Sequence, residues 1–246
     1  TDKLFVKQYE EETNLRCHIV FDNSSSMYFP FDETKPFISK SKTNYGLFVA
    51  AVIIYLLKLQ RDAFGLTVFS DKIEFHTGAR STSQHHKHLM NTLDSIAKET
   101  GTDKRKPTAI ADTLHQIAEQ IHKRSLVVII SDMLDGHNSA PQIIDALQHL
   151  RHNKHEIIVF HINDKQKEFE LNYENRPHKF IDMETGSELI LNPNDIRDEY
   201  QEYLKNMFQD ITKKCSAHRI DVVEIDINSP PDSILKPYLT KRKKMF

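Results

Sequence analysis

The sequence has little of what several functional classes require. Its 246 residues include two cysteines, Cys17 and Cys215, and each falls within a predicted structural element. This usage suits a reducing compartment and argues against a disulfide framework. The six glycines leave little material for a phosphate-binding loop, and no Walker A, Gly-x-Gly-x-x-Gly or Gly-x-Ser-x-Gly motif occurs. The chain therefore carries no recognised nucleotide-binding or hydrolase motif.

Two further absences concern charge and long apolar runs. The formal net charge is −2, so no global basic field favours nucleic acid. The longest apolar stretch, residues 47–57, is too short to span a membrane, and no signal peptide opens the chain. We therefore expect a cytoplasmic protein that binds neither nucleic acid nor membrane. Because the chain begins abruptly at Thr1, we also expect it to be a fragment that lacks an upstream segment.

No linker or low-complexity stretch divides the sequence. A chain of 246 residues can bury a sizeable core, and 28% charged against 39% hydrophobic residues is typical of a globular protein. We therefore expect one domain over residues 1–240. The basic residues that follow, in a tail over residues 241–246, are typical of a solvated, mobile terminus.

Apolar runs and helical periods alternate along the chain. The runs predict strands over residues 15–21, 63–69, 126–130, 156–162 and 220–227. Helical patterns cover residues 44–60, 85–98, 109–123, 140–151 and 193–218, and Pro230-Pro231 introduces a short terminal helix. Residues 179–191 read as a hairpin centred on Glu184-Thr185-Gly186. This order predicts a three-layer α/β sandwich with a mostly parallel, Rossmann-like sheet flanked by helices.

Polar residues follow two of these strands. The first strand ends in Asp22-Asn23-Ser24-Ser25-Ser26, and the central apolar strand ends at Asp132. In sheets of this kind, ligands bind outside the carboxyl ends of the strands, so both carboxylates are expected at one edge. Thr108 precedes a predicted helix and should reach the same edge. Such an oxygen cluster suits a hard divalent cation, Mg²⁺ or Mn²⁺.

With these residues the chain resembles a von Willebrand factor A-type domain that carries a metal-ion-dependent adhesion site. The site's pattern is Asp-x-Ser-x-Ser, then a Thr, then an Asp, and each member has a counterpart here, namely Asp22, Ser24, Ser26, Thr108 and Asp132. The resemblance implies that the hydroxyls of Ser24, Ser26 and Thr108 coordinate the ion. It also implies that Asp22 and Asp132 hold coordinated waters, and that a partner's Asp or Glu completes the site.

Wider stretches are similar to a bacterial family, domain-of-unknown-function family 58. They are Tyr9–Arg16, Gln60–Leu66, Ile130–Asp135 and His155–His161. Members of that family are often encoded beside MoxR-type AAA+ ATPases and are thought to act with them as adaptors or chaperone partners. The resemblance therefore implies a protein partner, a MoxR-type ATPase or its client.

Several alternatives stand beside this interpretation. The Asp22 segment could be a polar turn that caps the next element, and Thr102 competes with Thr108 as the threonine of the site. A haloacid-dehalogenase-type phosphohydrolase also places an Asp after its first strand, but its second Asp would be Ser24 here. His85, His86 and His88 lack the geometry of a zinc site and are expected on a solvated helix face. We therefore predict a metal-dependent binding module without catalytic residues.

Overall fold

A computed structural model describes residues 15–30, 41–98, 106–133 and 140–230 of the chain. Its centre is a six-stranded sheet with the order β3-β2-β1-β4-β5-β8. Neighbouring strands run parallel except β2 and β3, which are antiparallel. The strands are β1 (Arg16–Asp22), β2 (Ala63–Phe69), β3 (Ile73–Arg80), β4 (Leu126–Ser131), β5 (Glu156–Asn163) and β8 (Asp221–Asp226). The mostly parallel α/β sheet expected from the sequence is confirmed.

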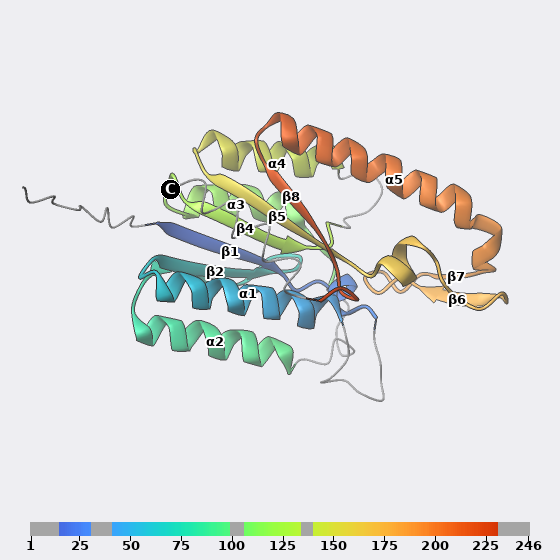
Figure 1. Cartoon of the computed structure of the whole chain (residues 1–246), viewed down its shortest axis with the longest axis horizontal. Helices are drawn as coiled ribbons and strands as arrows, with labels where there is room; N and C mark the ends of the chain where they lie inside the picture. Colours follow the sequence, from blue (N-terminus) through green and yellow to red (C-terminus); the bar gives the residue numbers. More distant parts are fainter. Residues whose placement is uncertain (1–14, 31–40, 99–105, 134–139, 231–246) are drawn as a thin grey trace, which may run out of the picture.

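Helices cover both faces of this sheet (Figure 1). One face packs against α1 (Lys42–Leu59) and α2 (Ser83–Ala97), and the other against α3 (Ile110–Gln120), α4 (Ala140–His152) and α5 (Pro193–Ala217). A short 3-10 helix, η1 (Ser25–Tyr28), follows β1, and a π-helical turn, η2 (Lys165–Phe169), follows β5. The small hairpin of β6 (His178–Ile181) and β7 (Glu188–Leu191) lies beyond the carboxyl ends of the parallel strands (Figure 1).

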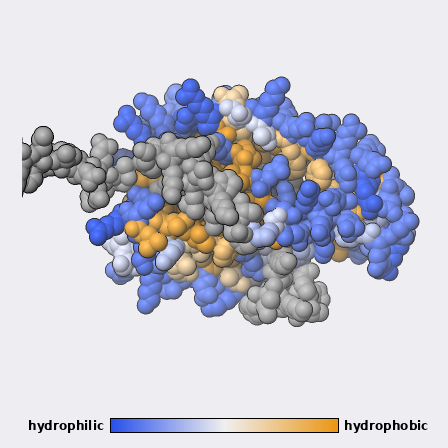
Figure 2. Space-filling model, in the orientation of Figure 1, coloured by the Kyte–Doolittle hydropathy of each residue, from blue (hydrophilic) through white to orange (hydrophobic). Residues whose placement is uncertain are grey.

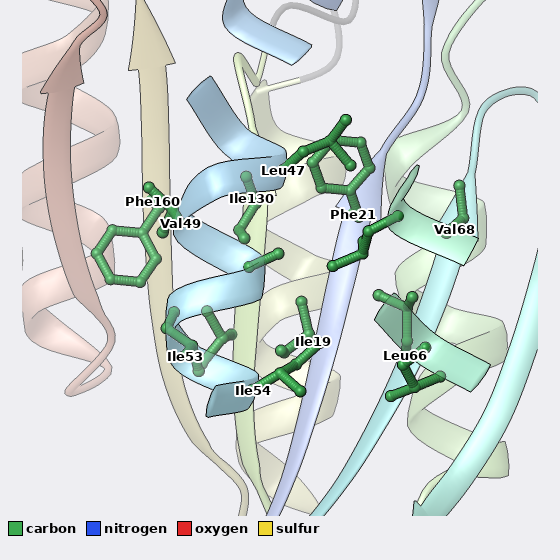
Figure 3. Packing of buried hydrophobic residues seen from close by; sticks show 14 of the residues in the cluster. Ile19, Phe21, Leu47, Val49, Ile53, Ile54, Leu66, Val68, Ile130 and Phe160 are labelled. Atoms are coloured by element: carbon green, nitrogen blue, oxygen red, sulfur yellow. The ribbon is translucent and has the colours of Figure 1, made fainter. Parts of the chain in front are cut away.

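The two helical layers bury alternate residues of the same strands. On β1, Ile19 and Phe21 face α1, whereas Val20 faces the layer of α3 and α4. On β4, Ile130 faces α1 and Ile129 faces the opposite layer. Figure 3 shows α1 lying along the strands over one face of the sheet, with its apolar side chains against those of β1, β4 and β5. A strand buried on both faces reads as a continuous apolar run, which is why these strands were visible in the sequence.

Strand β3 was not predicted, although its sequence carries a signal. Its residues alternate between half-buried and exposed positions, the pattern of a strand with one covered face. It pairs with β2 at the edge of the sheet, so it lacks the continuous apolar run that marks the central strands. The predicted hairpin is confirmed by the antiparallel pairing of β6 with β7. The helix expected after Pro230 lies outside the described residues.

Helix α1 requires a correction to the expectation that nothing here could cross a membrane. Of the described helices, it alone is long and apolar enough to do so by length and composition. Half of it is buried, against the sheet and α2, and a core helix passes the same test. Three apolar residues of α1 are nevertheless exposed, namely Phe48, Tyr55 and Leu59. Figure 2 shows hydrophobic surface in the region of this helix.

The expectation of a solvated histidine face on α2 is wrong for His85. This side chain is buried, and its Nε2 donates to the backbone oxygen of Phe64 at 2.9 Å. His88 is exposed, as expected. His85 therefore ties α2 to β2 and serves the packing of the fold.

Candidate metal site at the carboxyl edge of the sheet

The carboxyl ends of β1 and β4 bring Asp22 and Asp132 to the same edge of the sheet. The two strands are parallel neighbours with Phe21 in register with Ile130, so the residues that follow these partners leave the sheet side by side. Both carboxylates are buried, with 1% of each residue exposed. The shared edge predicted from the order of strands and helices is thus present in the fold.

Hydrogen bonds order the loop that follows β1 around Asp22. The backbone N–H of Ser24 donates to Oδ1 of Asp22 at 2.9 Å, and the hydroxyl of Ser131 donates to Oδ2 at 2.7 Å. With both of its carboxylate oxygens accepting, Asp22 fixes the course of the loop. The hydroxyl oxygens of Ser24 and Ser26 come to within 3.1 Å of each other. The Asp-x-Ser-x-Ser segment therefore presents two hydroxyls beside an anchoring carboxylate.

The segment that carries Thr108 is attached to the same loop. Lys106 and Ser25 exchange two hydrogen bonds, from the Ser25 N–H to the Lys106 carbonyl at 2.9 Å and from the Lys106 N–H to the Ser25 hydroxyl at 2.7 Å. The N–H of Ala109 donates to the carbonyl of Ser70 at 3.0 Å. These bonds hold Thr108 between two anchored residues, next to the loop after β1. Thr102, its competitor, lies outside the described residues, and Asp112 is exposed on α3.

Burial and mutual repulsion act on the carboxylates of this edge. Burial and, after it, the nearby charge of Asp132 together raise the pKa of Asp22 to about 7, even though hydrogen bonds from Ser131 and Ser24 act to lower it. Two buried carboxylates in one place favour the binding of positive charge. The fold supplies one such charge itself.

That charge is the ammonium group of Lys42, at the first residue of α1. Its Nζ lies 2.8 Å from Oδ2 of Asp132 and 2.5 Å from Oε1 of Glu168, and Lys42 is fully buried. Burial lowers the pKa of Lys42, but the charges of Asp132 and Glu168 outweigh burial and raise it above its usual value. No sequence pattern predicts this contact, because Glu168 lies 126 positions from Lys42 in the π-helical turn after β5.

Glu184, at the tip of the β6–β7 hairpin, also reaches the site. Its Oε2 accepts a hydrogen bond from the backbone N–H of Thr108 at 3.2 Å. Burial, with a smaller contribution from the charges of Asp132 and Asp22, raises the pKa of Glu184 to about 7, although the hydrogen bond from the Thr108 N–H acts to lower it. The Ser26 hydroxyl is also close enough to lower that pKa. One side chain thus interacts with four of the five residues predicted for the site.

The donor set fits a hard divalent cation. Hydroxyl and carboxylate oxygens are the ligands that Mg²⁺ accepts in proteins. The hydroxyl oxygen of Thr108 is buried and has no hydrogen-bond partner among the described residues, which leaves a donor atom unused at the edge. Across the described ranges, no group of three or more His, Cys, Asp and Glu side chains is arranged to hold a metal ion. The described residues therefore contain no site of the kind that binds zinc.

Comparisons with known proteins agree with the fold. The family model described as Protein of unknown function DUF58 matches residues 1–210. No curated protein matches the chain. Among solved structures, the conserved hypothetical protein BatB from Bacteroides thetaiotaomicron is similar with a TM-score of 0.60 and 17% identity, over 94% of this chain and 98% of that one.

Two more solved structures extend the comparison. An aerotolerance-related membrane protein from Bacteroides fragilis is similar with a TM-score of 0.56 and 14% identity, over 90% of this chain and 97% of that one. The VWA domain of SpRpn10 is similar with a TM-score of 0.47 and 13% identity, over 93% of this chain and 95% of that one. At 17% and 14% identity, the likeness to the two Bacteroides structures concerns the fold.

Proposed function

Because the chain belongs to the family of Protein of unknown function DUF58 and has a von Willebrand factor A-like α/β fold, we propose that it is a protein-interaction module whose carboxyl edge binds a divalent cation and, through it, a partner's carboxylate. Mg²⁺ is the expected ion and Mn²⁺ the alternative. The partner is a MoxR-type AAA+ ATPase or a client of that ATPase. The observation that carries the proposal is the gathering of Asp22, Ser24 and Ser26 beside Thr108 and Asp132.

Each residue has a role that its contacts support. The donors that would hold the ion are the hydroxyls of Ser24 and Ser26, 3.1 Å apart, and that of Thr108, which has no hydrogen-bond partner within the described ranges. Asp22 positions the serine loop through its two accepted hydrogen bonds. Asp132, bound to Lys42, adds negative charge at the edge. A bound cation would offer a coordination position to a carboxylate from outside.

Neutral donors matter for this kind of binding. When most direct ligands are hydroxyls, the ion keeps much of its positive charge and attracts an additional anionic ligand. Lys42 increases this attraction for an anionic ligand, because its ammonium compensates the charge of Asp132 within the protein and leaves more of the ion's charge uncompensated. The site is therefore suited to the capture of an acidic side chain, in keeping with an adaptor rather than an enzyme.

The test is binding of the purified MoxR-type ATPase from the same organism to the whole chain, measured in Mg²⁺ and in EDTA. We expect tighter binding in Mg²⁺ for the wild type and no metal effect for Asp22→Ala. Asp112→Ala, which changes an exposed Asp on α3, is the matched control. Binding that is equally tight in EDTA would contradict the role of the ion. Mg²⁺-dependent hydrolysis of p-nitrophenyl phosphate would instead favour the phosphohydrolase alternative.

A further inference from the structure

The β6–β7 hairpin sends one carboxylate into the candidate site. Glu184 lies 76 positions from Thr108 in the sequence, yet its Oε2 accepts from the Thr108 N–H at 3.2 Å. Its carboxylate also interacts electrostatically with Asp22, Asp132 and the Ser26 hydroxyl. Glu184 therefore occupies the place where a carboxylate from another protein would have to arrive.

The hairpin turn holds Glu184 in a defined position. Asp182 accepts hydrogen bonds from the N–H of Glu184 at 2.9 Å and from the hydroxyl of Thr185 at 2.5 Å. The turn closes through Gly186, which has a φ of 74° and donates from its N–H to the Asp182 carbonyl at 2.8 Å. A positive φ suits glycine because it has no Cβ. The backbone of Glu184 is thus constrained before any ion binds.

Two oxygen atoms at this contact make no hydrogen bond to any described residue. Oε1 of Glu184 and the hydroxyl oxygen of Thr108 are both buried, and neither has a hydrogen-bond partner in the described part of the chain. A buried polar atom without a partner destabilises a fold, because it has given up its hydrogen bonds with water. A hydrogen bond joins the two residues to which these atoms belong, Glu184 and Thr108. One hard cation between the two oxygen atoms and the hydroxyls of Ser24 and Ser26 would therefore give each of the two atoms a partner.

We infer that Glu184 is an internal ligand of the divalent cation, and that the β6–β7 hairpin thereby caps the site until a partner's carboxylate displaces it. This inference rests on the proposed function, because it assumes that the edge binds an ion. The hairpin is small enough to be displaced, because each of its two strands has four residues. Three of its apolar side chains are exposed, namely Ile181, Leu189 and Ile190. A two-stranded hairpin of this size is at best marginally stable alone.

A purely structural role for Glu184 makes a different prediction. If its carboxylate did no more than accept the hydrogen bond from the Thr108 N–H, Glu184→Gln would keep an acceptor oxygen and would leave ion binding unchanged. Glu188→Gln is the matched control: Glu188 is exposed on the same hairpin and pairs with Lys179 at 2.7 Å. Both variants remove one negative charge from the hairpin, but only Glu184→Gln removes a carboxylate from the candidate metal site.

The experiment titrates Mn²⁺ into the whole chain by calorimetry and follows hydrogen exchange of the hairpin amides. We expect Glu184→Gln to weaken Mn²⁺ binding about tenfold, since ligand charge sets the affinity of such sites, and Glu188→Gln to bind like the wild type. Mn²⁺ should slow exchange of the hairpin in the wild type and have no such effect in Glu184→Gln. Added acetate should restore part of the affinity of Glu184→Gln.

The possible failures differ from one another. If the wild type binds Mn²⁺, Asp22→Ala does not, and Glu184→Gln binds as tightly as the wild type with no protection of the hairpin, the cap is wrong and the proposed function stands. If the wild type itself binds no Mn²⁺, the proposed metal site is wrong, and the inference that Glu184 caps it is wrong as well.

Discussion

The ammonium of Lys42 lies 2.8 Å from Oδ2 of Asp132, and both residues are buried at the edge of the sheet that carries the candidate site. A buried ammonium next to a site rich in carboxylates has two effects. It compensates negative charge in the absence of an ion, and it reduces the excess charge that would otherwise bind an ion very tightly. Lys42 therefore connects the stability of the fold with the affinity of the site.

Replacing Lys42 with Met should lower the free energy of unfolding by about 3–5 kcal/mol, because the buried Asp132 carboxylate loses its partner and Glu168 loses a charge contact. Urea unfolding measures the change. Lys58→Met is the control, since Lys58 is exposed on the same helix and should change the stability by less than about 0.5 kcal/mol. Equal effects of the two variants would show that the buried ion pair contributes nothing.

Gly65 should not tolerate a larger residue. A Cβ at this position would lie 2.7 Å from the backbone oxygen of Thr77 and 2.7 Å from Nδ1 of His18. Gly65→Ala is therefore expected to lower the free energy of unfolding by about 2 kcal/mol, because backbone of the neighbouring strand must move.

The matched control for Gly65 is Gly78→Ala, since no described atom lies within 4 Å of a Cβ at Gly78. Gly78→Ala should leave the stability unchanged or slightly raised. Thermal unfolding of the two variants side by side measures the difference. A Gly65→Ala variant as stable as Gly78→Ala would contradict the close packing of β2 against β3.

Acid should destabilise the fold through two buried histidines. Burial, followed by the charge of His76, lowers the pKa of His18 to about 3, and burial lowers that of His161 to about 4. Their unfolded-state pKa is about 6.5, so below pH 6.5 the unfolded chain binds protons that the folded chain does not, and stability falls as the pH falls. Between pH 7 and pH 5 each histidine accounts for a loss on the order of 2 kcal/mol.

Urea unfolding of His18→Gln at both pH values isolates one of these contributions. The variant should lose about 2 kcal/mol less stability than the wild type between pH 7 and pH 5. His152→Gln, on the exposed side of α4, should follow the wild type. If the His18→Gln curve runs parallel to that of the wild type, His18 does not stay neutral in the fold.

The sequence predicted the parts of the site that follow from chain direction. Asp22 and Asp132 end parallel strands, and parallel neighbours deliver their carboxyl ends to one edge, so their common location could be inferred from two apolar runs. Thr108 is held next to the loop after β1 by hydrogen bonds between Lys106 and Ser25. No periodic pattern in the sequence predicts these bonds. The position of Thr108 before a predicted helix placed it at the same edge, but only the resemblance implied its role at the ion.

Lys42 and Glu184 could not be assigned to the site from the sequence. Glu184 was visible as the centre of a hairpin, but a hairpin pattern does not tell where its tip will lie in the fold. Lys42 precedes the helix predicted over residues 44–60, and its partner Glu168 belongs to a π-helical turn without a sequence signal. Contacts between elements that are distant in the chain depend on packing, which is why Lys42 and Glu184 were not predicted as residues of the site.

The central claim is that the edge formed by Asp22 and its neighbours binds a divalent cation, and calorimetric titration of Mg²⁺ and Mn²⁺ tests it most directly. The account predicts binding of one ion per chain to the wild type and to Asp112→Ala, and none to Asp22→Ala, with circular dichroism showing that all three are folded. An absence of binding to the wild type, or undiminished binding to Asp22→Ala, would contradict the account.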